Sequence, residues 1–185
     1  MSKLAKLLLA AVAFGVVVAV IKGQNTGARD ALGNTSAVWV VVPFLAGTRY
    51  ARVWQATLVG LATALVAFFG FYLAEAAILD LGTHSWGTRL SLTLGSGHFW
   101  EAWGLISGSV YGTLGGIWKS RSVRAAPIAV GLAFVCEPLI VLLLARAGVW
   151  GGSGGLLSYP SIWATEVLIG LGGIALVLAR TQRTR

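Results

Sequence analysis

Residues 53–79 read VWQATLVGLATALVAFFGFYLAEAAIL, and Glu75 is the one charged side chain in this run. The hydrocarbon core of a bilayer is ~30 Å thick, and roughly 20 apolar residues cross it as a helix. Hydrocarbon offers no partner to an unpaired strand edge, and the run does not alternate between apolar and polar residues. It therefore predicts a membrane-spanning α-helix.

Five other apolar runs fit the same interpretation. The predicted spans cover residues 4–21, 36–48, 53–79, 99–118, 126–145 and 162–179. The second is short and contains Pro43, and the fifth contains Pro138. We therefore expect an all-α polytopic membrane protein, in which residues 1–185 form a single domain, a bundle of six transmembrane helices.

The composition excludes other classes of protein. The chain of 185 residues is 57% hydrophobic and only 11% charged, whereas a soluble domain carries about 25% charged residues and a disordered chain has low hydrophobicity. Cys136 is the single cysteine, which excludes an internal disulfide and a cysteine-built metal site. The net charge of +8 is divided among short clusters between apolar runs, so we expect no nucleic-acid partner.

The first apolar run has an alternative interpretation. Lys3 and Lys6 followed by residues 7–21 resemble a secretory signal peptide. The run is at the long end for such a peptide, however, and Val20, Ile21 and Lys22 stand where a small-residue cleavage site would be expected. We therefore expect a retained helix.

Basic residues predict the orientation, because short cytoplasmic loops are enriched in lysine and arginine. With both termini in the cytoplasm, ten of the fourteen basic residues lie on the inner side: Lys3, Lys6, Arg49, Arg52, Lys119, Arg121, Arg124, Arg180, Arg183 and Arg185. The longer loops, residues 22–35, 80–98 and 148–161, then lie outside. The excess of arginine over lysine is typical of a GC-rich bacterial genome, so we expect a multi-pass protein of the bacterial cytoplasmic (plasma) membrane.

The tryptophans agree with this orientation, because indole rings prefer the headgroup layer. We expect each of them to be an interface anchor rather than a ligand-stacking residue. Those near outer ends are Trp39, Trp86, Trp100, Trp103, Trp150 and Trp163, and those near inner ends are Trp54 and Trp118.

Glycine spacing indicates close helix packing, since small residues let helix backbones approach in lipid. The predicted packing residues are Gly104, Gly108, Gly112 and Gly116 in the fourth span, and Gly170 and Gly173 in the sixth. The fifth span carries small residues at helical spacing too. We therefore expect spans four to six to pack together, with a homodimer through the glycine face as the alternative.

Three glutamates are the candidate ligand-binding residues. Helical spacing puts Glu101, Glu137 and Glu166 on the small-residue faces of the last three spans. A charge in hydrocarbon costs about 3 kcal/mol, so such acids face protein or a water-filled cavity. The hypothesis is an outward-facing acidic pocket for a small solute or a cation.

Each glutamate also has a structural interpretation. Pro138 frees the carbonyl of Phe134 beside Glu137, which favours a cation or amine site, and a protonated Glu137 bonded to a neighbouring helix is an equal alternative. For Glu101 and Glu166 we favour a helix-start acid paired with Arg89 or Arg146.

No reaction chemistry is indicated. His84 and His98, the two histidines, belong to an outer loop or its edge, so a serine hydrolase lacks its base. No Walker-type phosphate loop occurs. A metal site from His98, Glu101 and Glu166 is less favoured than none. We therefore expect no catalytic residue, no metal and no cofactor.

Several short motifs carry a resemblance. They are Asn34-Thr35-Ser36-Ala37-Val38-Trp39, Phe44-Leu45-Ala46-Gly47, Phe71-Tyr72, Phe99-Trp100, Gly108-Ser109-Val110-Tyr111-Gly112 and Cys136-Glu137. With them the chain resembles an uncharacterised actinobacterial family of small multi-pass membrane proteins, a domain of unknown function. Ser109 and Cys136 depart from that family's pattern, which has proline and glycine there. The resemblance implies a membrane location and no known activity.

Size, span count and glycine-rich helices are also similar to those of substrate-binding subunits of bacterial vitamin uptake systems, an analogy of fold alone. Two hypotheses follow: a non-enzymatic structural or accessory bundle, and a transport component that binds a small solute or cation. The expected partners are the lipid bilayer and, as open alternatives, such a ligand, another membrane protein or a second copy of the chain.

Overall fold

The computed structural model describes the chain except residues 25, 80–81, 83, 96–97, 149–157 and 183–185, and except the side chains of residues 98–101 and 180–182. The described residues form helices and connections, without a strand, which confirms the all-α class for this part of the chain. The helices are α1 (Lys3–Lys22), α2 (Gly27–Gly33), α3 (Ala37–Gly47), α4 (Val53–Ile78), α5 (Trp86–Gly95), α6 (His98–Arg121), α7 (Ala125–Arg146) and α9 (Pro160–Gln182).

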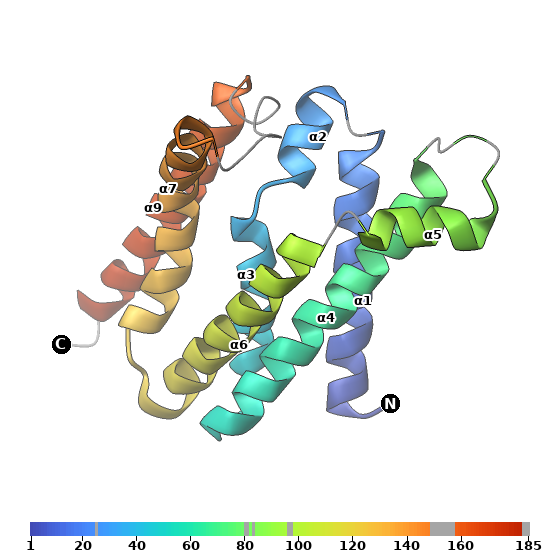
Figure 1. Ribbon diagram of the computed structural model, residues 1–185. Coiled ribbons are helices and arrows are strands. Elements are labelled where there is room, and N and C mark those ends of the chain that lie inside the picture. Colours follow the sequence, from blue (N-terminus) through green and yellow to red (C-terminus); the bar gives the residue numbers. More distant parts are fainter. Residues whose placement is uncertain (25, 80–81, 83, 96–97, 149–157, 183–185) are drawn as a thin grey trace.

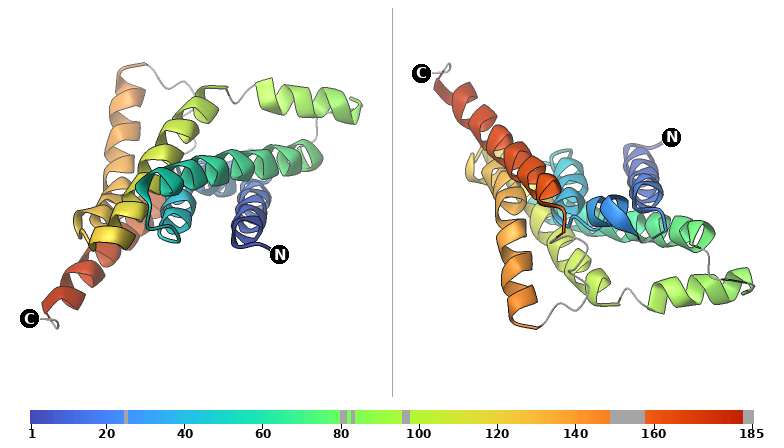
Figure 2. Two further views of the ribbon diagram at one scale, coloured as in Figure 1. Left: turned by 90° about the horizontal axis from the view of Figure 1, so that it is seen from below. Right: turned by 90° about the horizontal axis from the view of Figure 1, so that it is seen from above.

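All six predicted apolar runs are helical, as α1, α3, α4, α6, α7 and α9. These helices alternate in direction, so both termini lie at the same end (Figure 1). The helix pair α7 and α9 lies on one side of the bundle, and α1 lies on the other. Helices α3 and α6 lie between them (Figure 2). The expected outer loops differ from the structure, because α2 and α5 are helices within them.

Within the described ranges, four helices are long and apolar enough to cross a membrane: α1, α4, α7 and residues 160–179 of α9. With 11 residues, α3 is too short to do so alone. The 24 residues of α6 suffice in length, but their glycines, serines and tryptophans make this helix less apolar than the four. The structure therefore supports a membrane protein with four candidate spanning helices.

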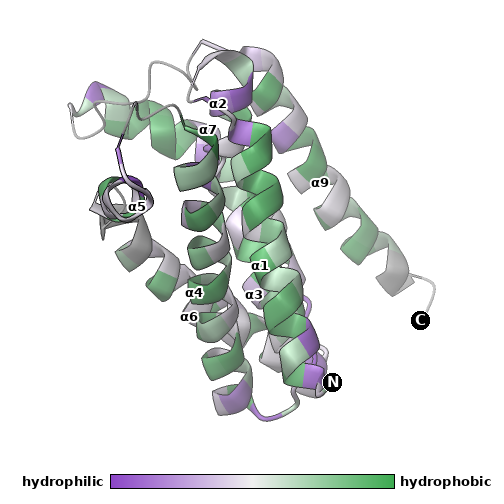
Figure 3. Cartoon of the chain, turned by 90° about the vertical axis from the view of Figure 1, so that its right-hand side faces the viewer, coloured by the Kyte–Doolittle hydropathy of each residue, from purple (hydrophilic) through white to green (hydrophobic). Residues whose placement is uncertain are grey.

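The surface is apolar where a soluble protein would be polar. Large apolar side chains are exposed along the helices, among them Leu9, Leu58, Leu143 and Leu168. Hydrophobic residues cover the middle of the helices, and hydrophilic residues gather toward their ends (Figure 3). Monomeric soluble proteins rarely expose continuous apolar surface, so this distribution supports a membrane protein.

The glycine face of α6 packs against α4. A Cβ on Gly112 would lie 2.6 Å from the Ala56 carbonyl oxygen and 2.7 Å from the Gly60 Cα. A Cβ on Gly104 would contact the Phe68 ring of α4. A Cβ on Gly108 or on Gly116 would contact an alanine side chain of α4. The prediction that spans four to six form one packed set is therefore wrong: the glycines of α6 meet α4 and α3, and α6 touches α7 much less.

The two glycines of α9 that were predicted to pack, Gly170 and Gly173, differ in their surroundings. A Cβ on Gly170 would lie 2.6 Å from the Gly131 carbonyl oxygen of α7, so α7 and α9 are in close backbone contact there. Gly173 meets no described atom within 4 Å and does not take part in the packing expected of it. The reason is angular, since a residue three positions along a helix is turned about 60° from the first.

Trp39 differs from its predicted role as an interface anchor. Its ring stacks on Phe68, with centroids 4.6 Å apart, and meets Phe14 and Phe71 edge to face at 5.4 and 5.5 Å. It therefore packs between α1, α3 and α4. Such aromatic pairs contribute about 0.5–1.5 kcal/mol beyond the area they bury. Trp54, Trp86, Trp103 and Trp118 are exposed, as anchors would be.

The contact between α4 and α6 predicts a large effect of a single methyl group. Gly112→Ala forces backbone atoms of α4 to move and should lower the free energy of unfolding in detergent by about 1–3 kcal/mol. Gly172→Ala is the control, because a Cβ there meets no described atom within 4 Å. The control should be neutral or up to ~1 kcal/mol more stable. Equal stability of the two variants would contradict the packing.

Candidate functional site

The carboxylate of Glu137, on α7, caps the start of α3. Its Oε1 accepts a hydrogen bond from the Ser36 N–H, and its Oε2 accepts one from the Ala37 N–H at 2.5 Å. Glu137 is 6% exposed. The first N–H groups of a helix have no partner within it, and the Ser36 side chain supplies none here. A residue far along the chain therefore completes the start of this helix.

The length of α3 explains why it needs such a partner. Eleven residues extend only about 16 Å, roughly half of the hydrocarbon core. Thr35 and Ala37 are each 3% exposed, whereas Ser36 between them is exposed, so it is above all the buried N–H of Ala37 that depends on an acceptor from the protein. An anion also favours the positive end of the helix dipole. Of the two interpretations of Glu137, this geometry favours a structural bond to a neighbouring helix, but both oxygens accept from N–H groups, which differs from the protonated carboxyl group expected.

Glu166, on α9, lies beside Glu137. Gly170, one turn after Glu166, contacts Gly131 of α7 and holds α9 against α7 here. The carboxyl groups of Glu137 and Glu166 are close enough to interact. Glu166 is 5% exposed, and its carboxyl oxygens face the carboxyl group of Glu137 and meet no N–H or hydroxyl donor among the described residues. The site thus contains one satisfied and one unsatisfied carboxyl group.

The expected arginine partner of Glu166 is not found in the described structure. Arg89 donates to the Leu79 carbonyl instead, and Arg146 is exposed at the end of α7. On α2, Arg29 donates to the carbonyls of Val20 and Ile21. That pairing prediction is wrong for Glu166, because each of these arginines is directed to backbone carbonyls or to the surface.

The arrangement of two carboxyl groups has an electrostatic consequence. An uncompensated buried charge costs several kcal/mol, and two like charges side by side cost more. Glu137 is compensated by the α3 N-terminus, whereas Glu166 faces that anion with no cation of the described chain. The pair therefore requires one positive charge from outside, which is either a proton on Glu166 or a bound cation.

Glu101, the third predicted ligand residue, has a side chain outside the described residues. It lies in the first turn of α6, and the side chain of His98 is outside the described residues too. The structure thus brings Glu137 and Glu166 together and makes no statement about Glu101. Among the described residues, no group of three His, Cys, Asp or Glu side chains could hold a metal ion.

A buried ion pair was not anticipated from the sequence. Lys22 Nζ lies 2.7 Å from Glu75 Oε1, and these side chains are 13% and 7% exposed. The ammonium group also lies 5.2 Å from the centroid of the Phe71 ring. The signal was present in the sequence, since opposite charges stand at the outer ends of the first and third predicted spans.

Comparisons with protein-family models, with curated proteins and with solved structures find no match to this chain. We therefore infer its function from its own residues.

The ion pair predicts an asymmetric mutational result. Lys22→Met leaves the Glu75 carboxylate buried without a partner and should lower the free energy of unfolding by about 3–5 kcal/mol. The double variant Lys22→Met/Glu75→Leu removes both charges and should recover most of that loss. Unfolding in mixed micelles measures both, and a double variant no more stable than the single one would contradict the buried pair.

Proposed function

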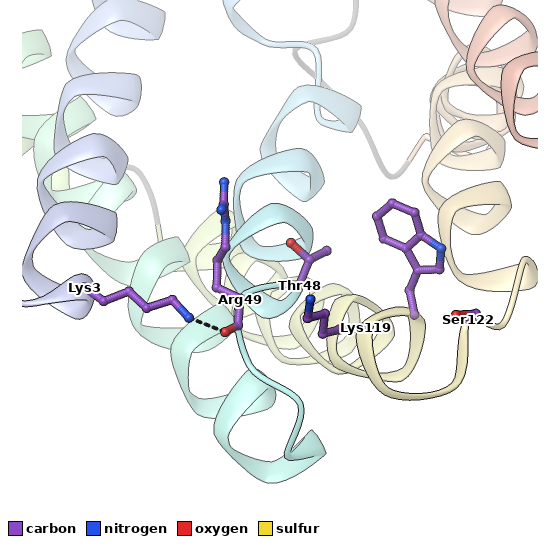
Figure 4. A pocket seen from close by; sticks show the side chains of 6 residues that line it. Lys3, Thr48, Arg49, Lys119 and Ser122 are labelled. Carbon is purple, nitrogen blue, oxygen red and sulfur yellow. Dashed lines mark hydrogen bonds between the residues drawn. The ribbon is translucent and has the colours of Figure 1, made fainter.

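We propose that this protein is a non-enzymatic structural or accessory component of the bacterial cytoplasmic membrane, which it crosses six times with both termini in the cytoplasm. The alternating helices and the common end of the termini support an even number of crossings (Figure 1). The basic residues Lys3, Arg49 and Lys119 lie at that end, as expected for the cytoplasmic side (Figure 4).

Two of the six crossings need an explanation, since α3 is short and α6 is less apolar. In the proposed arrangement α2 and α3 form one crossing, a helix broken at residues 34–36 and closed by Glu137. The glycines of α6 lie against α4 and α3, so protein rather than lipid covers its least apolar face. Irregular backbone within the membrane is tolerated where protein surrounds it.

The observation that carries the structural role is the state of Glu137. In membrane carriers, the N-termini of broken helices bind anionic groups of the substrate. Here the chain's own carboxylate fills that position on α3. A bond that ties α7 to α3 contributes to the stability of the bundle, and it leaves this helix end with no room for an anionic ligand.

Glutamine substitutions test this role. Glu137→Gln replaces one acceptor oxygen by an NH₂ group that opposes a backbone N–H, so it should lower the free energy of unfolding by about 2 kcal/mol. Glu166→Gln is the matched control, because this side chain accepts no hydrogen bond in the described structure. Comparable stability of Glu137→Gln and the parent protein would contradict the structural role.

The second candidate function is a transport component that binds a small solute or cation. The unpartnered, buried carboxyl group of Glu166 favours it, because that group requires a proton or another cation. A proton or cation bound to Glu166 would lie between α7 and α9, next to the start of α3 that Glu137 caps. A cationic ligand fits this environment, whereas an anionic one meets two carboxyl groups.

Thermal unfolding with added Na⁺, K⁺, Ca²⁺ or polyamine separates the two candidates. A cation bound to the native protein at 100 times its Kd stabilises it by about 2.7 kcal/mol. Transport predicts such a shift in the parent protein and none in Glu166→Gln. If no cation shifts the parent, Glu166 holds a proton, and the structural role stands alone.

A further inference from the structure

A basic cavity lies at the end of the bundle that carries the termini. It has a volume of about 570 Å³, and its lining residues are Lys3, Thr48, Arg49, Trp118, Lys119 and Ser122 (Figure 4). Three segments far apart in the sequence meet there: the start of α1, the residues after α3 and the end of α6. The cavity is remote from Glu137 and Glu166, which lie near the other end of the bundle.

Lys3, Arg49 and Lys119 are all exposed, and the fold fixes the position of the Lys3 ammonium group. Lys3 Nζ donates to the Arg49 carbonyl oxygen at 2.5 Å, and it lies 4.8 Å from the centroid of the Tyr50 ring. An ammonium group has three N–H donors, so further donors remain for a ligand. Lys119 follows in the last turn of α6, where a cation is favoured by the helix dipole.

No carboxylate compensates these charges in the described structure. Among the described residues the one ion pair joins Lys22 to Glu75, away from the cavity. The residues that line the cavity include no acidic residue. Three cationic side chains that line one cavity, together with Thr48 and Ser122, can form a site for an anion with several acceptor oxygens. A phosphodiester group has this chemistry.

The walls of the cavity indicate which phosphate compound fits. The indole of Trp118 lines it, and Leu45, one helical turn before Arg49, is 53% exposed. An anion with an attached apolar chain can therefore place its charge on the cations and its chain along these side chains. The position at the helix ends is also the depth of the headgroup layer.

We propose that this cavity binds the headgroup of an anionic phospholipid. Lys3, Arg49 and Lys119 contact the phosphodiester oxygens, and the acyl chains run along the apolar surface beside Trp118 and Leu45. The proposal rests on the membrane location of the protein, and it does not depend on the acidic pair. Basic pockets between membrane helices bind anionic lipids in this way.

Native mass spectrometry of the purified protein, titrated with phosphatidylglycerol or phosphatidylcholine, tests the proposal. The parent protein should retain phosphatidylglycerol selectively. The variant Lys3→Gln/Arg49→Gln/Lys119→Gln should lose about tenfold or more in affinity for that lipid, since each cation near the membrane surface contributes ~1 kcal/mol. Inorganic phosphate at millimolar concentration should not displace the lipid.

The matched control is Arg52→Gln/Arg121→Gln/Arg124→Gln. It removes the same charge from exposed residues at the same end, outside the cavity. Its affinity should fall less than that of the cavity variant, because these arginines share the general attraction of the surface but do not line the site. Equal losses in the two triple variants, or no preference for phosphatidylglycerol, would overturn the proposal. Displacement by inorganic phosphate would identify a soluble ligand instead, and failure of the parent protein to enter detergent micelles would refute the membrane location itself.

Discussion

Hydrocarbon offers no hydrogen-bond partner, so a helix that begins inside a membrane bundle depends on its neighbours. In the proposed crossing α3 is such a helix, because Ala37 at its start is buried and its length is far below that of a crossing. The carboxylate of Glu137 supplies the acceptors for the N–H groups of Ser36 and Ala37. This bond fixes α7 against α3, and α9 is then positioned by its contact with α7. The environment of Glu166 follows from the same arrangement.

Close backbone packing occurs in the middle of the molecule, and the charged groups lie toward its two ends. The middle is held by backbone contact, at Gly60 and Gly112 between α4 and α6 and at Gly131 and Gly170 between α7 and α9. The buried ion pair of Lys22 and Glu75 lies toward one end, on the same side as the acidic pair. The opposite end carries uncompensated cations. The acidic pair and the basic cavity therefore lie in different parts of the bundle.

Much of the fold could be predicted from the sequence, because lipid restricts what a long apolar run can form. Helix existence, approximate bounds and the importance of Gly112 and Gly170 follow from length and spacing. The partner of the α6 glycine face could not be predicted, since spacing shows that a face packs and not which helix meets it. For the same reason Trp39 was expected at the interface, although its ring lies among Phe14, Phe68 and Phe71. The bond from Glu137 to α3 needed the spatial arrangement, because nothing in the local sequence relates these segments.

The central claim is that α2 and α3 together make one crossing, closed by Glu137. Single cysteines in a Cys136→Ser background test it most directly, one at the exposed Thr26 before α2 and one at the exposed Ala51 after α3. In intact cells, a membrane-impermeant maleimide should label the cysteine at position 26 and leave the one at position 51 unlabelled until the membrane is permeabilised. Labelling of both positions from the same side would contradict the account, because α2 and α3 would then enter and leave the bilayer on one face.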